Sequence, residues 1–414
     1  MRLRIKDYTT KVGSGVTPRG GAETYLNEGI PLFRSQNVTN DGFLMDDIAY
    51  ISEEVDEMMK GTRVKPGDVL LNITGASIGR CFFTSNDFGR GNVNQHVCII
   101  RPKKNVTLPA YLHYCIVSDK GQEQINLTQT GANREGLSIE DIKGFSFDIP
   151  PLSKQQRIVD YLDEKLGNID ARIAVLEKQQ DAHARLKKSI IYHTVTRGLN
   201  PDVSLKDSGA DWIGMIPEHW IMKRLKDISI LNPQYKRDGV EGVVSYLPME
   251  GLRLGALELQ EISFGEGKGK YTFFENNDLL IAKVTPCFEN GNIAIAQKLR
   301  SGMGFGSSEI FVLRVLKDAN IRYLFYYVQT PSFQGEACTT MCGVGGLKRI
   351  SPLFMRQRLI PLPSLSEQQA IVAYLDEKCT KINASSENIG KQIDALKRLK
   401  RALINEVVTG QRTV

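Results

Sequence analysis

The sequence predicts an α+β protein in which two α/β domains are separated by two long antiparallel helices that form a coiled coil, with a pseudo-two-fold internal repeat. Three observations predict this fold. The stretch LSKQQRIVDYLDEK, beginning at Leu152, recurs as LSEQQAIVAYLDEK, beginning at Leu365, with 11 of 14 positions identical. Apolar residues then follow at alternating steps of four and three, which is the heptad pattern of a coiled coil. Each copy also follows a segment that mixes short strands, helices and glycine-rich loops.

The repeat divides the chain of 414 residues into four expected parts. These are a first domain at 1–148, a first spacer helix with its linker at 149–200, a second domain at 201–362 and a second spacer helix at 363–414. Two long helices of one chain can pair antiparallel only if their domains lie at opposite ends, so we expect a dumbbell.

The two domain segments resemble each other less closely than the two helices do. PGDVLLNITG at 66–75 parallels NNDLLIAKVT at 276–285, and VNQHVCIIRP at 93–102 parallels GSSEIFVLRV at 306–315. In the first pair, a polar turn precedes a buried strand. One core with two different sets of loops is typical of one scaffold that binds two different targets.

Each long helix has a predicted start and a predicted packing face. Ser153 and Ser366 are expected to cap, with Gln156 and Gln369 completing an S-x-x-Q capping box. The seam is expected to consist of Leu162, Leu166, Ile169, Ile173, Leu176 and Ile190 in the first helix, and of Leu375, Ile382, Ile389, Ile393, Leu396 and Leu403 in the second. Gln180, His183, Lys187, Ser386 and Lys400 interrupt this seam, and polar residues at such positions can fix the register. At 1.5 Å per residue, such a helix is roughly 65 Å long.

Composition sets broad limits. A formal net charge of +6 favours an anionic partner only slightly. Seven cysteines, an odd number without a CxxC pair, indicate free thiols rather than a zinc site or a disulfide framework. Apolar runs fall short of the ~18–20 residues that cross a bilayer, and the N-terminus MRLRIKDYTT lacks a signal-peptide core. We therefore expect a cytoplasmic protein without a metal or a membrane partner.

On three markers, the chain resembles the specificity (S) subunit of a type I restriction–modification system. They are PxLSxQQxIVxYLDEK in two copies, the linker TRGLNPDVSLKDSGADWIGMIPEHW at 196–220, and GDVLLNITGASIG at 67–79. The resemblance covers essentially the whole chain. The chain departs from an even repeat in one respect, because IPEHW at 216–220 introduces the second domain and the first domain lacks a counterpart.

This resemblance implies a function. It implies two target recognition domains that each read one half of a bipartite double-stranded DNA sequence, with the helices as a spacer that sets the gap. It also implies two modification (M) subunits that carry S-adenosylmethionine and methylate adenine, and restriction (R) subunits that cleave DNA. This chain would then need no cofactor and no catalytic residue.

Base readout uses Arg or Lys for guanine and Asn or Gln for adenine. In the first domain the candidates are Arg19, Arg34, Gln36, Asn37, Asn72, Thr74, Arg90, Asn92, Asn94, Gln95, His96, Asn133 and Arg134. In the second domain they are Tyr235, Lys236, Arg237, Lys283, Thr285, Asn290, Asn292, Ser307, Ser308, Lys348 and Arg349. Each of these could instead be an ordinary polar loop residue that caps a turn.

Two other functions remain open from the residues alone. A stand-alone methyltransferase or nuclease is suggested by NPQY at 232–235 and by DEK at 163–165 and 376–378, but a cofactor loop and a second catalytic cluster are missing. A coiled-coil scaffold without nucleic acid is the other alternative. The duplicated domains with divergent loops favour DNA recognition, since a scaffold has no need for two different readers.

Overall fold

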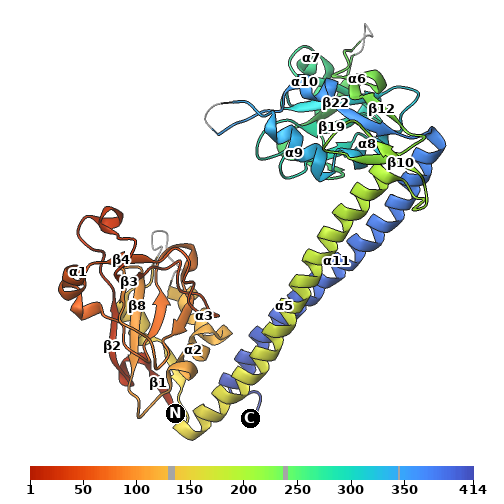
Figure 1. Cartoon of the computed structure of the whole chain (residues 1–414). Coiled ribbons are helices and arrows are strands. Elements are labelled where there is room, and N and C mark those ends of the chain that lie inside the picture. The colour runs from red at the N-terminus through yellow and green to blue at the C-terminus, as the bar shows by residue number, and fades with distance from the viewer. Residues whose placement is uncertain (129–135, 236–240, 344–345) are drawn as a thin grey trace. The chain divides into compact units, whose positions relative to one another are not determined.

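The computed structural model describes residues 1–128, 136–235, 241–343 and 346–414 (Figure 1). The chain forms two compact units. Unit 1 contains Met1–Glu177 and Lys391–Val414, and unit 2 contains Lys178–Gly390. The two long helices are α5 (Leu152–Arg197) and α11 (Leu365–Val408), and each contributes one end to each unit.

Unit 1 begins with nine short strands and four helices ahead of α5 in the described residues. The strands are β1 (Arg2–Arg4), β2 (Thr9–Ser14), β3 (Ile30–Phe33), β4 (Ala49–Ile51), β5 (Val69–Asn72), β6 (Cys81–Phe83), β7 (Asn92–Val93), β8 (Val97–Pro102) and β9 (Ser146–Asp148). The helices are α1 (Glu53–Met58), α2 (Pro109–Val117), α3 (Asp119–Thr128) and α4 (Ile139–Gly144).

The central sheet of unit 1 has the order β2-β8-β5-β6 and is antiparallel. Side chains alternate between the two faces of a strand, and both faces of this sheet are buried. One face, with Leu71 and Ile100, packs against α2 and the helix pair. The other face, with Leu70 and Ile99, packs against Phe33 and Val93 of the β4-β3-β7 sheet. Unit 1 is therefore layered as helices, sheet and sheet.

Unit 2 has more strands around the same plan. They are β10 (Leu205–Asp207), β11 (Met215–Pro217), β12 (Ile221–Arg224), β13 (Ser229–Leu231), β14 (Val243–Leu247), β15 (Leu252–Arg253), β16 (Ala256–Leu257), β17 (Gln260–Ser263), β18 (Thr272–Glu275), β19 (Leu279–Ala282), β20 (Ile293–Ile295), β21 (Met303–Gly306), β22 (Ile310–Val315) and β23 (Leu359–Leu362). The helices are α6 (Leu225–Ile228), α7 (Phe264–Gly267), α8 (Ile321–Tyr327), α9 (Pro331–Thr339) and α10 (Pro352–Gln357).

The central sheet of unit 2, β13-β22-β19-β20, corresponds strand by strand to that of unit 1. Val69 pairs with Ile100 in unit 1, and Leu279 pairs with Leu313 in unit 2. The second sheet, β17-β14-β21-β18, has one strand more than its counterpart. The predicted α+β fold with an internal repeat is confirmed, and the divergence lies in the outer sheet and the loops.

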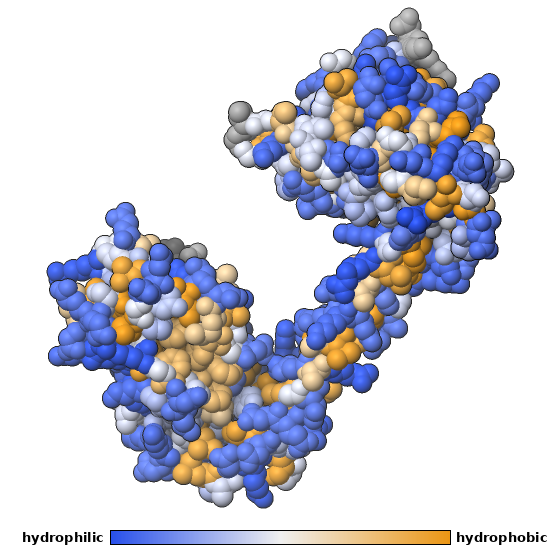
Figure 2. Space-filling model, in the orientation of Figure 1, coloured by the Kyte–Doolittle hydropathy of each residue, from blue (hydrophilic) through white to orange (hydrophobic). Residues whose placement is uncertain are grey.

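The two helices run antiparallel within each unit. In unit 1 the ammonium group of Lys400 on α11 donates to Asp170 on α5. In unit 2 the ammonium group of Lys187 donates to Asn383, and Gln180 donates to the Ser386 carbonyl, so rising residue numbers on α5 meet falling numbers on α11. Most residues of the predicted seam are buried, and Ile169, Ile190, Ile382 and Leu396 are half-buried. Figure 2 shows hydrophilic side chains over much of the visible helical surface, with apolar residues gathered in strips.

The predicted capping boxes are wrong. Ser153 and Ser366 already lie in the first helical turn, because the helices begin one residue earlier at Leu152 and Leu365. Ser364 occupies the cap position of α11, and its hydroxyl accepts the Glu367 amide at 3.3 Å. At α5 the backbone carbonyl of Pro151 accepts the first amides instead.

A buried glutamine anchors each helix to its own domain. The Gln155 amide donates to the carbonyls of Val106 and Pro150 at 2.9 and 2.8 Å, and its oxygen accepts from the Thr107 hydroxyl and the Leu108 amide at 3.1 and 2.9 Å. Gln368, at the equivalent position of the second copy, repeats this pattern. It donates to Asp318 and Pro363 and accepts from the Asn320 amide at 2.7 Å. Both glutamines are fully buried.

The segment expected to be a linker is part of the unit 2 core. Strands β10 and β11 form a hairpin, and Trp220 after it is fully buried. The Trp220 indole donates to a Glu367 carboxylate oxygen at 3.0 Å, and His219 lies 3.0 Å from the other oxygen. Unit 1 has Lys154 at the position equivalent to Glu367, which fits the missing IPEHW counterpart there.

Candidate nucleic-acid interface

In both units, polar side chains gather where the two central strands of the main sheet meet their loops. Strand β5 ends at Asn72 and β8 begins at Val97, and the equivalent β19 ends at Ala282 and β22 begins at Ile310. β5 and β8 pair antiparallel, as do β19 and β22, so the loop after the first strand and the loop before the second strand share one edge. The same edge of each unit therefore presents polar loops.

The first loop cluster, in unit 1, consists of Thr74, Gln95 and His96. The Thr74 hydroxyl lies 2.6 Å from Nδ1 of His96, and the Gln95 amide lies 3.3 Å from Nε2 of the same ring. Gln95 is exposed and the other two are half-buried. The cluster thus offers hydrogen-bond donors and acceptors that are oriented by one another.

The second loop cluster, in unit 2, consists of Thr285, Ser308, Glu309, Lys348 and Arg349. The guanidinium group of Arg349 binds Glu309 through two hydrogen bonds of 2.8 and 2.9 Å. The Thr285 hydroxyl donates to the Gly346 carbonyl and accepts the Lys348 amide, both at 3.0 Å. Lys283 lies beside this cluster, with its ammonium group 5.6 Å from the Phe311 ring centre. Sequence patterns do not single out Glu309, although it stands at the position equivalent to His96 of unit 1.

These contacts shift two pKa values in the second loop cluster, and the hydrogen bond to Glu309 raises the pKa of Arg349 above its ordinary value. The hydrogen bond from Arg349 lowers the pKa of Glu309 below its ordinary value, against the smaller effect of burial. The carboxylate therefore stays ionised at neutral pH and holds the guanidinium group in place. A cationic cluster in unit 2 and a largely neutral cluster in unit 1 occupy equivalent positions, so the two edges differ in the groups that they can bind.

Loop 34–47 of unit 1 carries the next candidates. Arg34 donates to the Asp47 backbone carbonyl at 2.6 Å, and Gln36 donates to the Asp47 carboxylate at 2.5 Å. Gln36 is exposed and Arg34 is half-buried. Asp47 therefore orients both side chains, and no sequence pattern singles it out.

Four predicted asparagines serve the structure instead. Asn37, Asn72, Asn92 and Asn94 are buried. The Asn72 amide donates to the carbonyls of Ser35 and Val38, and the Asn37 amide donates to the carbonyl of Leu44 at 3.1 Å. The side-chain oxygen of Asn94 accepts the His96 backbone amide at 3.1 Å. Their side chains are engaged within unit 1 and present little surface to a partner, so DNA contact by these four residues stays a prediction.

Arg90 and Asn92 converge with Arg63 on Asp56, a carboxylate with no exposed surface. Arg63 binds it at 2.8 Å and Asn92 at 2.9 Å. Burial by itself would raise the pKa of Asp56, but hydrogen bonds from Arg63, Asn92 and Arg90 outweigh it and hold the pKa below its ordinary value. This is a buried ion cluster that fixes α1 against β7.

Replacing Asp56 by asparagine is expected to destabilise the protein at pH 7, and this loss is expected to shrink in acid. A depressed folded-state pKa stabilises the fold above the unfolded pKa, and this contribution disappears as pH falls through the folded value. The difference in unfolding free energy between wild type and Asp56→Asn should therefore be constant near neutrality and narrow below about pH 4. Urea unfolding at several pH values measures it, and a pH-independent difference would contradict this assignment.

The remaining candidates are scattered. Arg19 and Asn290 are exposed, and Tyr235, Asn292 and Ser307 are half-buried. The ring of Tyr235 packs on Phe264 and Phe273. Four candidates lie outside the described residues, namely Asn133, Arg134, Lys236 and Arg237.

The motifs that suggested catalysis have structural contacts. The side-chain oxygen of Asn232 in NPQY accepts the Val312 backbone amide at 2.9 Å. The aspartates of the two DEK motifs, Asp163 and Asp376, accept the hydroxyls of Tyr114 and Tyr326 at 2.5 and 2.6 Å. Within the described ranges, the structure contains no group of three or more His, Cys, Asp or Glu side chains arranged to hold a metal. The helices in those ranges are also too short or too polar to cross a membrane.

Comparison with curated proteins identifies relatives of this chain. The EcoAI specificity subunit of Escherichia coli is 30% identical over 200 residues, which cover 47% of this chain and 34% of that protein. The chain thus matches about a third of that relative's length. The EcoKI specificity subunit of Escherichia coli strain K12 is 21% identical over 99% of this chain and 88% of its own length. The putative MjaX specificity subunit of Methanocaldococcus jannaschii is 24% identical over 98% of this chain and 92% of its own length.

Solved structures share the fold. A chain described under "Structural basis underlying complex assembly and conformational transition of the type I R-M system" matches with a TM-score of 0.74 and 16% identity, covering 99% of this chain and 97% of its own. The HsdS subunit from Thermoanaerobacter tengcongensis matches with a TM-score of 0.55 and 17% identity, and the match covers 100% of this chain and 97% of that subunit.

A family model connects these findings with the repeat. The model described as "Type I restriction modification DNA specificity domain" matches twice, at residues 3–180 and 217–395. Each match spans one domain together with most of the helix that follows it. This chain therefore belongs to the family of specificity subunits of type I restriction–modification systems, whose part in these systems is recognition rather than catalysis.

Proposed function

We propose that each unit reads one half of a bipartite DNA sequence and that α5 and α11 act as the spacer between the two readers. The observation that carries this proposal is the pair of loop clusters. They lie at the same edge of equivalent sheets but present different chemistry, a threonine–glutamine–histidine set in unit 1 and a lysine–arginine set in unit 2. A duplicated scaffold with divergent polar loops fits recognition of two different short sequences.

The proposed base contacts are the exposed and half-buried members of the clusters. In unit 1 these are Gln95 with Thr74 and His96, and Gln36 and Arg19 from other loops of the same unit. In unit 2 they are Lys348, Arg349, Lys283, Thr285 and Ser308. Glutamine pairs with adenine and arginine or lysine with guanine in the major groove. Arg349 would exchange its bond to Glu309 for a base or a phosphate.

The proposed partners are two M subunits, which bind S-adenosylmethionine and methylate adenine, and R subunits, which cleave DNA. The family membership supports these partners, and so does the similarity to a chain from a study of type I assembly. We also propose that the protein works in the cytoplasm, and that the domain limits at 148, 200 and 362 separate readers from spacers.

A genome-wide map of N6-methyladenine, with the gene present and deleted, tests this function. We expect deletion to remove methylation from one split motif, in which two short half-sites flank a fixed gap, and to leave other methylated sites unchanged. Retention of every methylated motif in the deletion strain, with the protein and its M partner expressed in the parent, would refute the proposal.

Replacing Gln95 by alanine is expected to relax base discrimination at one half-site only. Loss of a bidentate glutamine–adenine contact costs about 1–3 kcal/mol, so discrimination should fall by about tenfold at that base pair. Methylation rates on duplexes with single base-pair changes in either half measure this. Ser308→Ala at the equivalent position of unit 2 should affect the other half-site, and Gln156→Ala on the exposed face of α5 should affect neither.

A further inference from the structure

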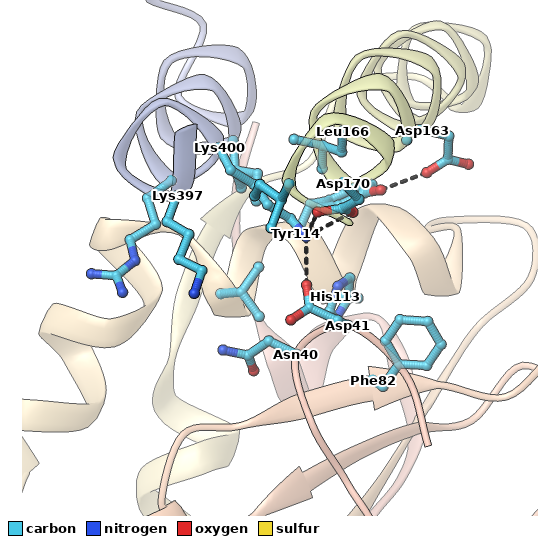
Figure 3. Close-up of a pocket in the computed structure, with 15 residues that line it drawn as sticks. Asn40, Asp41, Phe82, His113, Tyr114, Asp163, Leu166, Asp170, Lys397 and Lys400 are labelled. Atoms are coloured by element: carbon cyan, nitrogen blue, oxygen red, sulfur yellow. Dashed lines mark hydrogen bonds and ion pairs between the residues drawn. The ribbon is translucent and has the colours of Figure 1, made fainter. Parts of the chain in front are cut away.

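A cavity of about 590 Å³ lies within unit 1, between loop 34–47, α2 and the ends of both long helices (Figure 3). Its lining includes Asn40 and Asp41 from the loop, His113 from α2, Asp170 from α5, and Lys397 and Lys400 from α11. Burial lowers the pKa of His113 to about 4, so this imidazole is neutral. The charges in the cavity come from the two lysines, Arg401 and the carboxylates.

Lys400 joins three segments at this cavity. Its ammonium group donates to Asp41 at 2.5 Å and to both carboxylate oxygens of Asp170 at 2.8 and 2.9 Å (Figure 3). The Lys400 side chain is only 18% exposed. Burial alone would lower the pKa of Lys400, but hydrogen bonds to Asp170 and Asp41 outweigh it and raise the pKa, so the ion contacts persist at neutral pH.

Loop 34–47 is braced along its length. The side-chain amide of Asn72, at the end of β5, donates to the carbonyls of Ser35 and Val38 and so holds the first turn of loop 34–47. The Asn40 side chain accepts the Cys81 backbone amide of β6 at 3.0 Å. Phe43 packs between Phe33, Phe82 and Phe88. Asp41 therefore lies in the same braced loop as the candidate DNA-contacting residues Arg34 and Gln36, which Asp47 orients.

The repeat supplies an internal comparison. Lys187 of the first copy is equivalent to Lys400 of the second, and its ammonium group donates to Asn383. Asn383 is the repeat equivalent of Asp170, with a neutral amide in place of the carboxylate. Lys187 thus preserves the cross-helix contact, while the link to a loop carboxylate is a feature of Lys400. The first contact lies between the two helices, whereas the second joins α11 to a loop, so the second contact points to a separate role.

We propose that Lys400 is a positioning residue for DNA recognition by unit 1, because it ties the loop that carries Arg34 and Gln36 to both spacer helices through Asp41 and Asp170. This proposal rests on the function proposed above. It makes the helix pair part of the first reader: a shift of α11 relative to α5 is passed to loop 34–47, and the fidelity of the first half-site depends on it.

The test uses the complex of this chain with its M subunits and the duplex whose bipartite sequence the methylation map returns. Initial methylation rates are measured on that duplex and on duplexes with one base pair changed in either half. Lys400→Met and Asp41→Asn are each expected to lower discrimination about two- to fivefold at the half-site that Gln95→Ala affects, and to leave the other half-site unchanged. The double variant should lose no more than Lys400→Met alone, because both changes break the same link.

Lys187→Met is the matched control, and it should leave discrimination at the first half-site unchanged. Wild-type discrimination by both Lys400→Met and Asp41→Asn would overturn the inference, as would an equal loss at both half-sites, which indicates general loosening of the helix pair. Since Asp41 is 70% exposed, Asp41→Asn keeps the test valid if Lys400→Met fails to fold. A wild-type complex without bipartite methylation would instead refute the proposed function, and this inference with it.

Discussion

Replacing Arg101 by leucine is expected to lower the free energy of unfolding of unit 1 by about 3–5 kcal/mol, because it leaves a buried carboxylate without its cationic partner. Arg101 binds Asp68 through two hydrogen bonds of 2.7 Å, and Asp68 has no exposed surface. Arg314 and Asp278 form the equivalent pair in unit 2, at 2.8 and 2.6 Å, and Asp278 is 1% exposed. Each pair joins the two central strands of its sheet, so Arg314→Leu should cost unit 2 a similar amount.

The two units can be followed separately. Both tryptophans of the chain, Trp212 and Trp220, lie in unit 2. In urea unfolding, Arg314→Leu should therefore shift the tryptophan fluorescence transition to lower denaturant. Arg101→Leu should shift only part of the circular dichroism transition. The control is Arg4→Leu, whose exposed ion pair with Asp7 is worth at most about 1 kcal/mol. Equal effects of Arg4→Leu and Arg101→Leu would show that burial of Asp68 does not matter.

Replacing Gln155 by leucine is expected to cost unit 1 about 2–4 kcal/mol, and Gln368→Leu is expected to cost unit 2 a similar amount. Leucine cannot bond the backbone groups that each glutamine satisfies, and an unsatisfied buried polar group costs about 1–3 kcal/mol. The loss should appear as weaker docking of the helix start on its domain. Hydrogen exchange should therefore rise at the Leu108 amide in Gln155→Leu and at the Asn320 amide in Gln368→Leu, since these amides donate to the glutamines.

The adjacent glutamine is the control for this experiment. Gln156 and Gln369 are exposed, so Gln156→Leu and Gln369→Leu should change unfolding free energy by no more than about 0.5 kcal/mol. The comparison keeps residue type, helix position and substitution constant and changes only burial. Similar losses from both members of the QQ pair would contradict a specific anchoring role for the first.

The repeat also shows where sequence patterns mislead. The S-x-x-Q pattern predicts serine caps at both helix starts, but the helices begin one residue earlier. Gln155 and Gln368 anchor the helices, and the sequence pattern cannot distinguish them from their exposed neighbours. The segment at 196–220 has the composition of a linker between two domains, yet Trp220 and Ile213 belong to the core of unit 2.

Among candidate DNA contacts, residue type is a poor guide. Asn72 and Gln95 both carry amides that could pair with adenine, and of these two only Gln95 is exposed. Arg90 and Arg349 both lie in polar loops, but Arg90 is bound to a buried carboxylate and Arg349 to a half-buried one at the proposed reading edge. An arginine or asparagine in a glycine-rich loop satisfies the requirements of either role until its neighbours are known.

Periodicity and the repeat suffice to predict the duplicated architecture, the two long helices, the apolar seam and the two central strands of each main sheet. These features are local in the chain or related by a nearly constant offset, so they can be found without coordinates. Which polar residues face outward and which are buried as anchors emerges only from the folded units. Residues such as Asp56 and Arg90, or Asp41 and Lys400, meet across 34 and 359 residues of chain, and only packing of the whole unit brings such charges together.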